Sequence, residues 1–298
     1  MTLEYIYFEK KQHYIIFMLW YNIYPDFQNA IFYLNSKQLS EEMSKKMKRL
    51  SGIVLCCAAL ISVAAEVVFD GGKAAVWSSK YFKDGEGGIV AYLSYPIVQS
   101  KDFITVESGK TYVIEGEFRL ITPKEKLPQL YFGFMPYTAD GKVINYTCIG
   151  IVSSKLMTVV KDVKAGDTKM VVNEFPFPKP ARYGRFVFGA KADKSDLPNF
   201  NISPAADWSK NKVNADGSVE ITFQQPVTQA VAAGTVVRLH TAGNTFVYAG
   251  IKRIGKEWVT CRQEYKSFYP GTAKIKLAMN LPAPGCKVEM RNVKVTVK

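Results

Sequence analysis

The sequence predicts an all-β protein in which two antiparallel sheets form a sandwich and a smaller β region is inserted into it. Three observations lead to this prediction. Short runs alternate apolar and polar residues, turn residues separate these runs, and the chain beyond residue 65 sustains no apolar helical period over three turns. Hydrophobic residues make up 48% of the chain, which is enough to form a large core.

The clearest strand pattern begins at Lys110. Its apolar and polar residues fall on opposite faces of an extended chain: Tyr112, Ile114, Phe118 and Leu120 on one, Thr111, Glu115, Glu117 and Arg119 on the other. Shorter alternations begin at Val219 and at Ile275, and turn residues bound them at 215–218 and at 270–271. This spacing of strands and turns is typical of a sandwich or a barrel.

The last apolar run of the chain changes phase. Five of its residues are expected to face the core, but two fall in one phase and three in the other: Val288 and Met290, then Val293, Val295 and Val297. One extra residue near Arg291 and Asn292 would bring all five to the same face. We therefore predict a β-bulge at that point.

The middle of the chain differs from its two flanks in its density of turn residues. Residues 154–249 contain three stretches dense in turn residues, at 164–168, 175–180 and 196–200. We therefore expect residues 66–153 and 250–298 to form the main sandwich, and residues 154–249 to form an inserted β-rich subdomain.

The start of the chain has the pattern of a secretory signal peptide. Four basic residues between positions 45 and 49 precede an apolar run at 50–63, and small residues follow at 63–65, where signal peptidase would cleave. The apolar run has 14 residues, fewer than the roughly 20 that span a bilayer. No integral membrane span is expected after cleavage.

We therefore expect residues 47–65 to be the signal peptide and residues 1–46 to be an upstream extension, because translation would start at Met47. The mature protein would then be secreted, periplasmic or held at the cell surface. The sequence leaves one alternative open, in which residues 1–46 are a genuine amphipathic or membrane-touching segment.

The formal net charge of +13 permits binding to anionic polymers. The lysines, however, are scattered singly over predicted strands and turns, and they form no dense basic run with interleaved aromatic residues. Nucleic acid is therefore not an expected partner.

Cysteine and histidine usage limits the chemistry. Beyond residue 65 the chain holds Cys148, Cys261 and Cys286, which allow either one disulfide with a free thiol or three small buried side chains. His240 is the single histidine there, so a His-rich zinc site is excluded. The sequence also contains no Gly-x-Ser-x-Gly motif and no Gly-rich phosphate-binding loop. We expect neither a metal nor another cofactor.

Two blocks near the ends of the predicted sandwich carry a family resemblance. The run 103–112 resembles the strand that opens the core of jelly-roll carbohydrate-binding modules. The runs 257–260, 269–272 and 288–293 resemble the closing strands of the same modules. The middle segment resembles an insertion in uncharacterised secreted proteins of polysaccharide-degrading bacteria. The resemblance implies a jelly-roll sandwich that binds carbohydrate, without an activity, and no calcium site is predicted because Met290 and Arg291 stand where acidic residues would be needed.

Carbohydrate binding requires exposed aromatic rings that stack on sugars and polar groups that bond to hydroxyls. Tyr81 and Trp208 lie in polar, turn-like surroundings and are the rings expected to be exposed. Arg238 and His240 alternate onto one face of a strand and would assist if the ligand is acidic. These four residues are the predicted ligand-binding site, and a polysaccharide or glycan is the predicted partner. Core packing is the alternative role for such rings.

The predicted function is non-catalytic, no catalytic residue is assigned, and two alternatives stay open. Glu115 and Glu117 would lie about 7 Å apart on one strand face, which suits a glycosidase pair, but such acids are common on solvated strands. The first alternative is a β-jelly-roll polysaccharide lyase for an acidic glycan, because 81–83 resembles part of an alginate-lyase motif and Arg238 and His240 share a face. The second is a structural surface-assembly protein without a ligand.

Overall fold

The structure is a computed structural model that describes residues 65–78, 80, 82–93, 97–122, 125–176, 183–280 and 285–298. Its strands run from β1 to β17, every strand pairing is antiparallel, and no α-helix occurs among these residues. The predicted all-β fold is therefore confirmed. The expected upstream extension, 1–46, and all but the last residue of the expected signal peptide, 47–65, lie outside the described residues.

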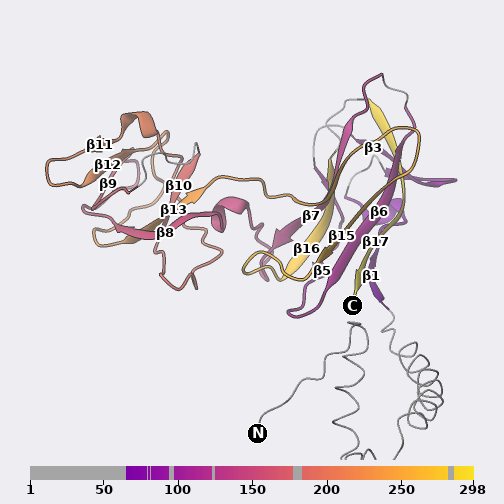
Figure 1. Ribbon diagram of the computed structural model, residues 1–298, viewed down its shortest axis with the longest axis horizontal. Helices are drawn as coiled ribbons and strands as arrows, with labels where there is room; N and C mark the ends of the chain where they lie inside the picture. Colours follow the sequence, from indigo (N-terminus) through magenta and orange to yellow (C-terminus); the bar gives the residue numbers. More distant parts are fainter. Residues whose placement is uncertain are drawn as a thin grey trace, which may run out of the picture. The chain divides into compact units, whose positions relative to one another are not determined.

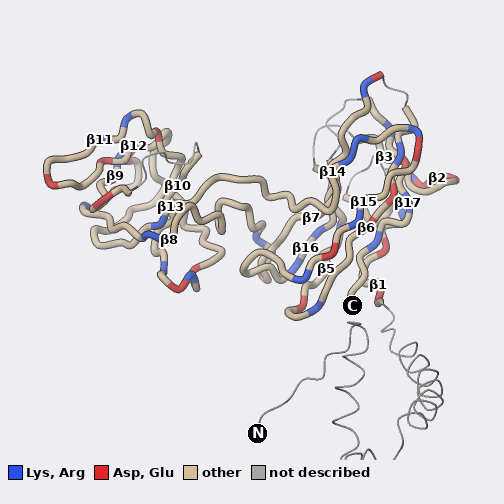
Figure 2. The backbone as a smooth tube through the Cα atoms, in the orientation of Figure 1, with Lys and Arg blue, Asp and Glu red and all other residues tan. Residues whose placement is uncertain are grey.

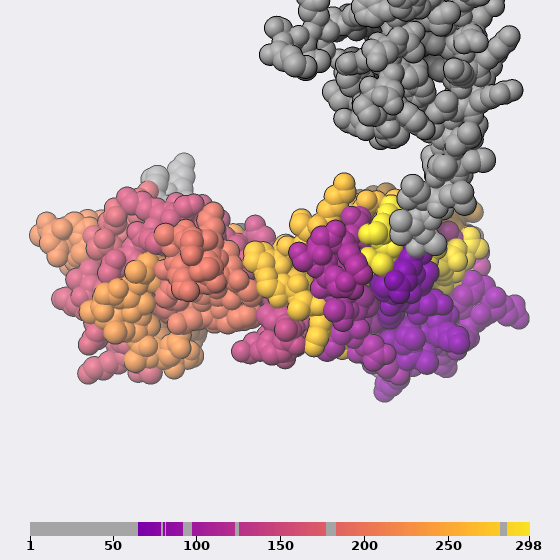
Figure 3. Space-filling view, turned by 90° about the horizontal axis from the view of Figure 1, so that it is seen from below, coloured from indigo at the N-terminus to yellow at the C-terminus, as the bar shows by residue number. Residues whose placement is uncertain are grey.

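The first sheet of the sandwich contains the longest strand of the protein. Its order is β15-β6-β17-β3-β2, and β1 pairs with the far end of β17 (Figure 1). The bounds are Val259–Tyr265 for β15, Tyr112–Leu120 for β6, Cys286–Val297 for β17, Gly88–Leu93 for β3, Phe82–Gly85 for β2 and Glu66–Asp70 for β1. Because β1 pairs with β17, the first described strand and the last one lie side by side, as Figure 3 shows in indigo and yellow.

The second sheet has the order β14-β7-β16-β4, and β5 also pairs with β16. The bounds are Val247–Arg253 for β14, Gln129–Tyr137 for β7, Lys274–Asn280 for β16, Val98–Gln99 for β4 and Ile104–Thr105 for β5. One large apolar core contains side chains of both sheets, and the rings of Phe118 and Phe132 meet within it with centroids 4.9 Å apart. The two sheets therefore form a sandwich. Jelly-roll connectivity stays a prediction.

The bulge predicted near the end of the chain is confirmed. The pairing of β17 with β6 shifts between Arg291 and Lys294, and Asn292 has a φ of 53°. Asparagine tolerates this left-handed conformation better than most residues. All five apolar residues on both sides of the bulge are buried in the core: Val288, Met290, Val293, Val295 and Val297.

The remaining strands form two small sheets with a core of their own. Their orders are β10-β13-β8 and β11-β12-β9. The bounds are Ile151–Thr158 for β8, Lys169–Val172 for β9, Gly184–Phe188 for β10, Lys212–Val213 for β11, Val219–Thr222 for β12 and Val236–Thr241 for β13. These strands lie within residues 151–241, whereas β14, which begins at Val247 inside the expected insertion 154–249, belongs to the sandwich. We call residues 151–241 the inserted region.

All three cysteines of the described chain are buried and unpaired, so Cys148, Cys261 and Cys286 form no disulfide. Burial raises the pKa of the Cys261 thiol to about 11, which keeps it protonated and unreactive at neutral pH. The interpretation as small buried side chains is the correct one. Within the described ranges, no helix has the length and apolar character needed to cross a membrane.

Candidate functional site

Of the two predicted ligand-binding rings, the structure describes one. Tyr81 lies outside the described residues. Trp208 lies in the short 3-10 segment η5 (Trp208–Lys210) and packs against the core of the inserted region. Its ring stacks on Phe175 at 5.3 Å and lies 6.1 Å from Phe186. Trp208 is therefore half-buried, and the alternative of core packing describes it better than an exposed ring.

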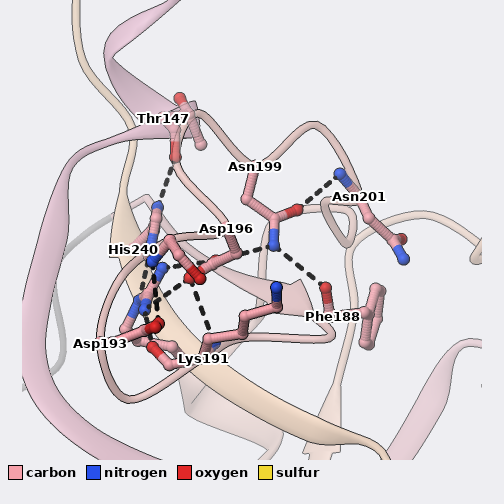
Figure 4. A network of polar contacts seen from close by, with 10 residues as sticks. Thr147, Phe188, Lys191, Asp193, Asp196, Asn199, Asn201 and His240 are labelled. Carbon is pink, nitrogen blue, oxygen red and sulfur yellow. Dashed lines mark hydrogen bonds and ion pairs between the residues drawn. The ribbon is translucent and has the colours of Figure 1, made fainter. Parts of the chain in front are cut away.

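Arg238 and His240 lie inside the inserted region, on β13, and are 1% and 0% exposed. Arg238 forms an ion pair with Asp196 at 2.8 Å and donates a hydrogen bond to the Lys191 carbonyl at 3.0 Å. Its Nε donates to His240 Nε2 at 3.0 Å. Because Nε2 accepts there, the proton of the neutral imidazole is on Nδ1, which lies 2.7 Å from the Thr147 carbonyl (Figure 4).

This network lowers the pKa of two of its groups, His240 and Asp196. Burial lowers the pKa of His240, and the nearby Arg238 guanidinium lowers it further against the opposing effect of the Thr147 carbonyl. Burial alone would raise the pKa of Asp196, but hydrogen bonds from Asn199, from the Lys191 backbone and from Arg238 outweigh it and lower that pKa.

This geometry does not support the expectation that Arg238 and His240 help to bind an acidic ligand. The strand alternation did place the two side chains on one face, but both are buried, and each nitrogen of the two side chains lies against a partner within the protein. Their role is structural: they attach the loop 191–199 and the 3-10 segment η4 (Tyr146–Cys148) to β13.

The outer face of the first sheet is covered by paired ions, and we call it the charged face. It contains Glu115, Glu117, Arg119, Arg262, Glu264, Lys287, Glu289, Arg291 and Lys294. Glu115 pairs with Arg262 and Lys294, and Glu117 pairs with Arg291 at 2.6 Å. Figure 2 shows both signs of charge along β6, β15 and β17. Charges of both signs thus neutralise one another on this face.

These ion pairs do not support a role of Glu115 and Glu117 as the catalytic acids of a glycosidase. A catalytic acid needs a raised pKa to hold its proton near neutral pH. The hydrogen bond from Arg291 instead lowers the pKa of Glu117, while burial opposes it only in part. Glu117 is therefore held ionised.

The outer face of the second sheet is different, and we call it the aromatic face. It contains Gln99, Phe103, Tyr131, Met135, Tyr137, Phe246, Tyr248, Ile251, Lys274, Lys276 and Asn280. The alternate residues of β7 and β16, such as Phe132 and Leu277, are buried in the sandwich core, so these side chains lie on the other side of the sheet. Met135, Tyr137 and Phe246 are buried there in a small cluster with Ala278, whereas Phe103 and Tyr248 are exposed. None of the described strands of this sheet contains Asp or Glu.

The strand register orders this face into rows. Asn280 pairs with Tyr131, Lys276 with Met135, and Lys274 with Tyr137. Tyr131 and Tyr137 are six positions apart on β7, which corresponds to about 20 Å along the strand.

Phe103 occupies one end of the aromatic face. Its ring is 42% exposed and meets the Tyr137 ring edge to face at 5.0 Å. Lys276 Nζ lies 4.4 Å and Lys274 Nζ 5.5 Å from the centroid of the same ring. Lys276 donates to the Lys101 carbonyl at 2.6 Å and Lys274 to the Ala139 carbonyl at 2.8 Å. An exposed ring and two fixed ammonium groups are thus adjacent.

Tyr248 occupies the other end. It is 37% exposed, and its ring lies 5.7 Å from Tyr131 and 5.0 Å from the buried Phe246. The Tyr265 hydroxyl donates to the Tyr248 carbonyl at 2.8 Å. Tyr248 is therefore an exposed ring on a supported backbone.

A glycine allows β14 to approach β7 beside this ring. A Cβ at Gly133 would lie 1.9 Å from the Val247 carbonyl oxygen, so no other residue fits without moving the strand. The pairing of the two strands also shifts between Tyr248 and Gly250. This close approach positions Tyr248 over the sheet.

Sequence reasoning missed the aromatic face. Residues 130–137 are almost entirely apolar, and such a run does not reveal which of its rings point outward. The available signal was that one face of an antiparallel sandwich sheet normally meets solvent, so some of these rings had to be there.

Comparisons with family models, with curated proteins and with solved structures found no match to this chain. Among the described residues, no group of three His, Cys, Asp or Glu side chains could hold a metal ion. The function therefore has to be inferred from the chain's own surface.

Proposed function

We propose that this protein is an exported, non-catalytic binding protein that recognises a polysaccharide or glycan through its aromatic face. One observation carries the proposal: exposed rings, Phe103 and Tyr248, stand at the two ends of an outer sheet face whose strands contain no acidic residue. The pattern at residues 47–65 supports export.

The chemistry of such a face suits sugars. An aromatic ring offers a flat apolar surface to the C–H groups of a pyranose, while nearby amides, hydroxyls and ammonium groups bond to its hydroxyls. Gln99, Asn280 and Lys276 are polar groups of this kind on the same face. Rings on a sheet also lose little conformational entropy on binding, because the sheet already fixes the backbone.

The lyase alternative receives less support. Its proposed histidine, His240, is buried, and both ring nitrogens lie against internal partners. A catalytic base must reach a proton on the substrate, and a fully buried side chain has no such access.

A glycan array followed by titration calorimetry tests the proposal. Phe103→Ala and Tyr248→Ala should each weaken binding by about five- to tenfold, because each removes about 1 kcal/mol of ring contact. Tyr183→Ala is the matched control, since Tyr183 is an exposed ring in the inserted region. If no glycan binds at millimolar concentration, the proposal fails.

Export is tested separately by N-terminal sequencing of the secreted protein. The expected first residue is Glu66. A mature chain that begins well before this residue would contradict the signal-peptide assignment.

A further inference from the structure

We infer that the aromatic face selects an anionic polysaccharide, whose carboxylate or sulfate groups bind to Lys274 and Lys276 while a sugar ring lies on Phe103. This inference rests on the proposed function and adds the chemical class of the ligand. It assigns Lys274 and Lys276 as the residues that determine specificity.

The first argument is the distribution of charge over the two sheets. Acidic residues occur in five strands of the first sheet, where those of the charged face are paired with basic residues. The described strands of the second sheet contain basic residues and no acidic ones. The aromatic face therefore presents positive charge that its own strands do not neutralise, and a ligand of opposite charge complements it.

The second argument is the bonding of the two ammonium groups. Each has three N–H donors, and the contacts to the Lys101 and Ala139 carbonyls use one donor of each lysine. Neither Lys274 nor Lys276 forms an ion pair with a carboxylate of the described chain, and the nearby Asp140 pairs with Lys142 at 3.5 Å. Donors on both lysines are thus available to an anion.

The third argument is preorganisation. A lysine normally loses much rotamer freedom when it binds a ligand, which weakens the complex. Here the carbonyl bonds and the Phe103 ring already hold both ammonium groups in place. Lys274 and Lys276 are two residues apart on one strand, so their backbones are about 7 Å apart and both lysines can reach one anionic sugar unit or two adjacent ones.

The experiment compares polysaccharides that differ only in charge. The probes are polygalacturonate with its carboxyl-reduced, neutral form, and dextran sulfate with dextran. At low salt, the exported protein should bind at least one anionic member about tenfold more tightly than its neutral counterpart, and added salt should remove most of this difference.

Two double variants identify the residues. Lys274→Gln/Lys276→Gln should lower affinity for the anionic probe to that of its neutral counterpart. Lys161→Gln/Lys212→Gln removes the same net charge from exposed lysines of the inserted region and should leave the preference in place. Phe103→Ala should weaken binding of the anionic probe in both the wild-type and the lysine-variant background.

The outcomes separate the two proposals. Equal binding of charged and neutral probes, or an equal loss in both lysine variants, overturns the anionic inference. Binding of neutral glycans alone overturns it too, but leaves the proposed function standing. If neither the array nor these probes bind, both proposals fail.

Discussion

The two outer faces of the sandwich differ in how their polar groups are satisfied. On the charged face, Arg119 pairs with Glu289, and both Arg119 and Arg291 lie over the Trp258 ring at 4.6 and 4.2 Å. On the aromatic face, the exposed Phe103 ring lies beside Lys274 and Lys276, which donate to backbone carbonyls and form no ion pair with a carboxylate of the described residues. The ions of the charged face are thus paired within the protein, whereas the two lysines of the aromatic face have no carboxylate partner among the described residues.

This difference separates two uses of an outer sheet surface. Exposed ion pairs contribute about 0 to 1 kcal/mol each to stability and leave few groups to recognise a partner. Exposed rings add little to the fold, but they contribute to binding once a ligand covers them. If the proposed function holds, substitutions of the paired ions on the charged face should change stability, and substitutions of the exposed rings and lysines of the aromatic face should change binding.

The largest expected effect comes from Gly133→Ala, which breaks the support of the aromatic face. The added methyl group would overlap the Val247 carbonyl, so β14 must move and stability should fall by about 3 kcal/mol. Denaturant unfolding measures the loss. Gly255→Ala is the control, because its Cβ would make only ordinary contacts with Leu127. A loss no greater than that of the control would show that β14 adapts freely.

A smaller effect is expected from Arg119→Met on the charged face. The substitution leaves the largely buried Glu289 carboxylate without its counter-ion, so stability should fall by about 2 kcal/mol. Glycan affinity should not change. Lys276→Gln is the mirror experiment, with a stability change below about 0.5 kcal/mol and weaker binding. If both variants lose stability and binding alike, the functional separation of the two faces is wrong.

A pH-dependent loss is expected from the buried network of the inserted region, which contrasts with the surface pairs of the charged face. Because the pKa of His240 is lowered by folding, its contribution is complete at high pH and is lost as pH falls below the unfolded value of about 6.5. Thermal unfolding between pH 7.5 and 5.5 should show this decline. In His240→Gln the slope should flatten, and an unchanged slope would contradict the assignment.

The smallest effect is expected from Glu117→Gln, a single pair on the charged face. The pKa of Glu117 is lowered by its hydrogen bond from Arg291, so the pair stabilises the fold above about pH 4.5 and is lost as pH falls through the folded value. At pH 7 the variant should lose a few tenths of a kcal/mol. The difference should disappear in strong acid, and a difference that grows there would be inconsistent with this pair.

The candidate site was harder to predict than the fold. Trp208 lies in a polar stretch of sequence, yet contacts with Phe175 and Phe186 draw its ring into a core. Arginine is usually a surface residue, yet the Arg238 side chain is buried because the carboxylate of Asp196, 42 positions away, neutralises its charge. Contacts between residues far apart in the sequence produce no local sequence pattern. The burial of Trp208 and Arg238 could therefore not be predicted from the residues next to them in the chain.

The sequence by itself determined the strands and the bulge near Asn292, because side-chain alternation and its change of phase are local properties of an extended chain. Only the tertiary structure decided which outward face carries paired ions and which carries rings. Strand order brings Glu117 to Arg291 and Phe103 to Lys276, across 174 and 173 positions of the chain. Ion pairs and ring contacts form between side chains that are neighbours in space. Which side chains become neighbours depends on the strand order and packing of whole sheets, not on the local sequence.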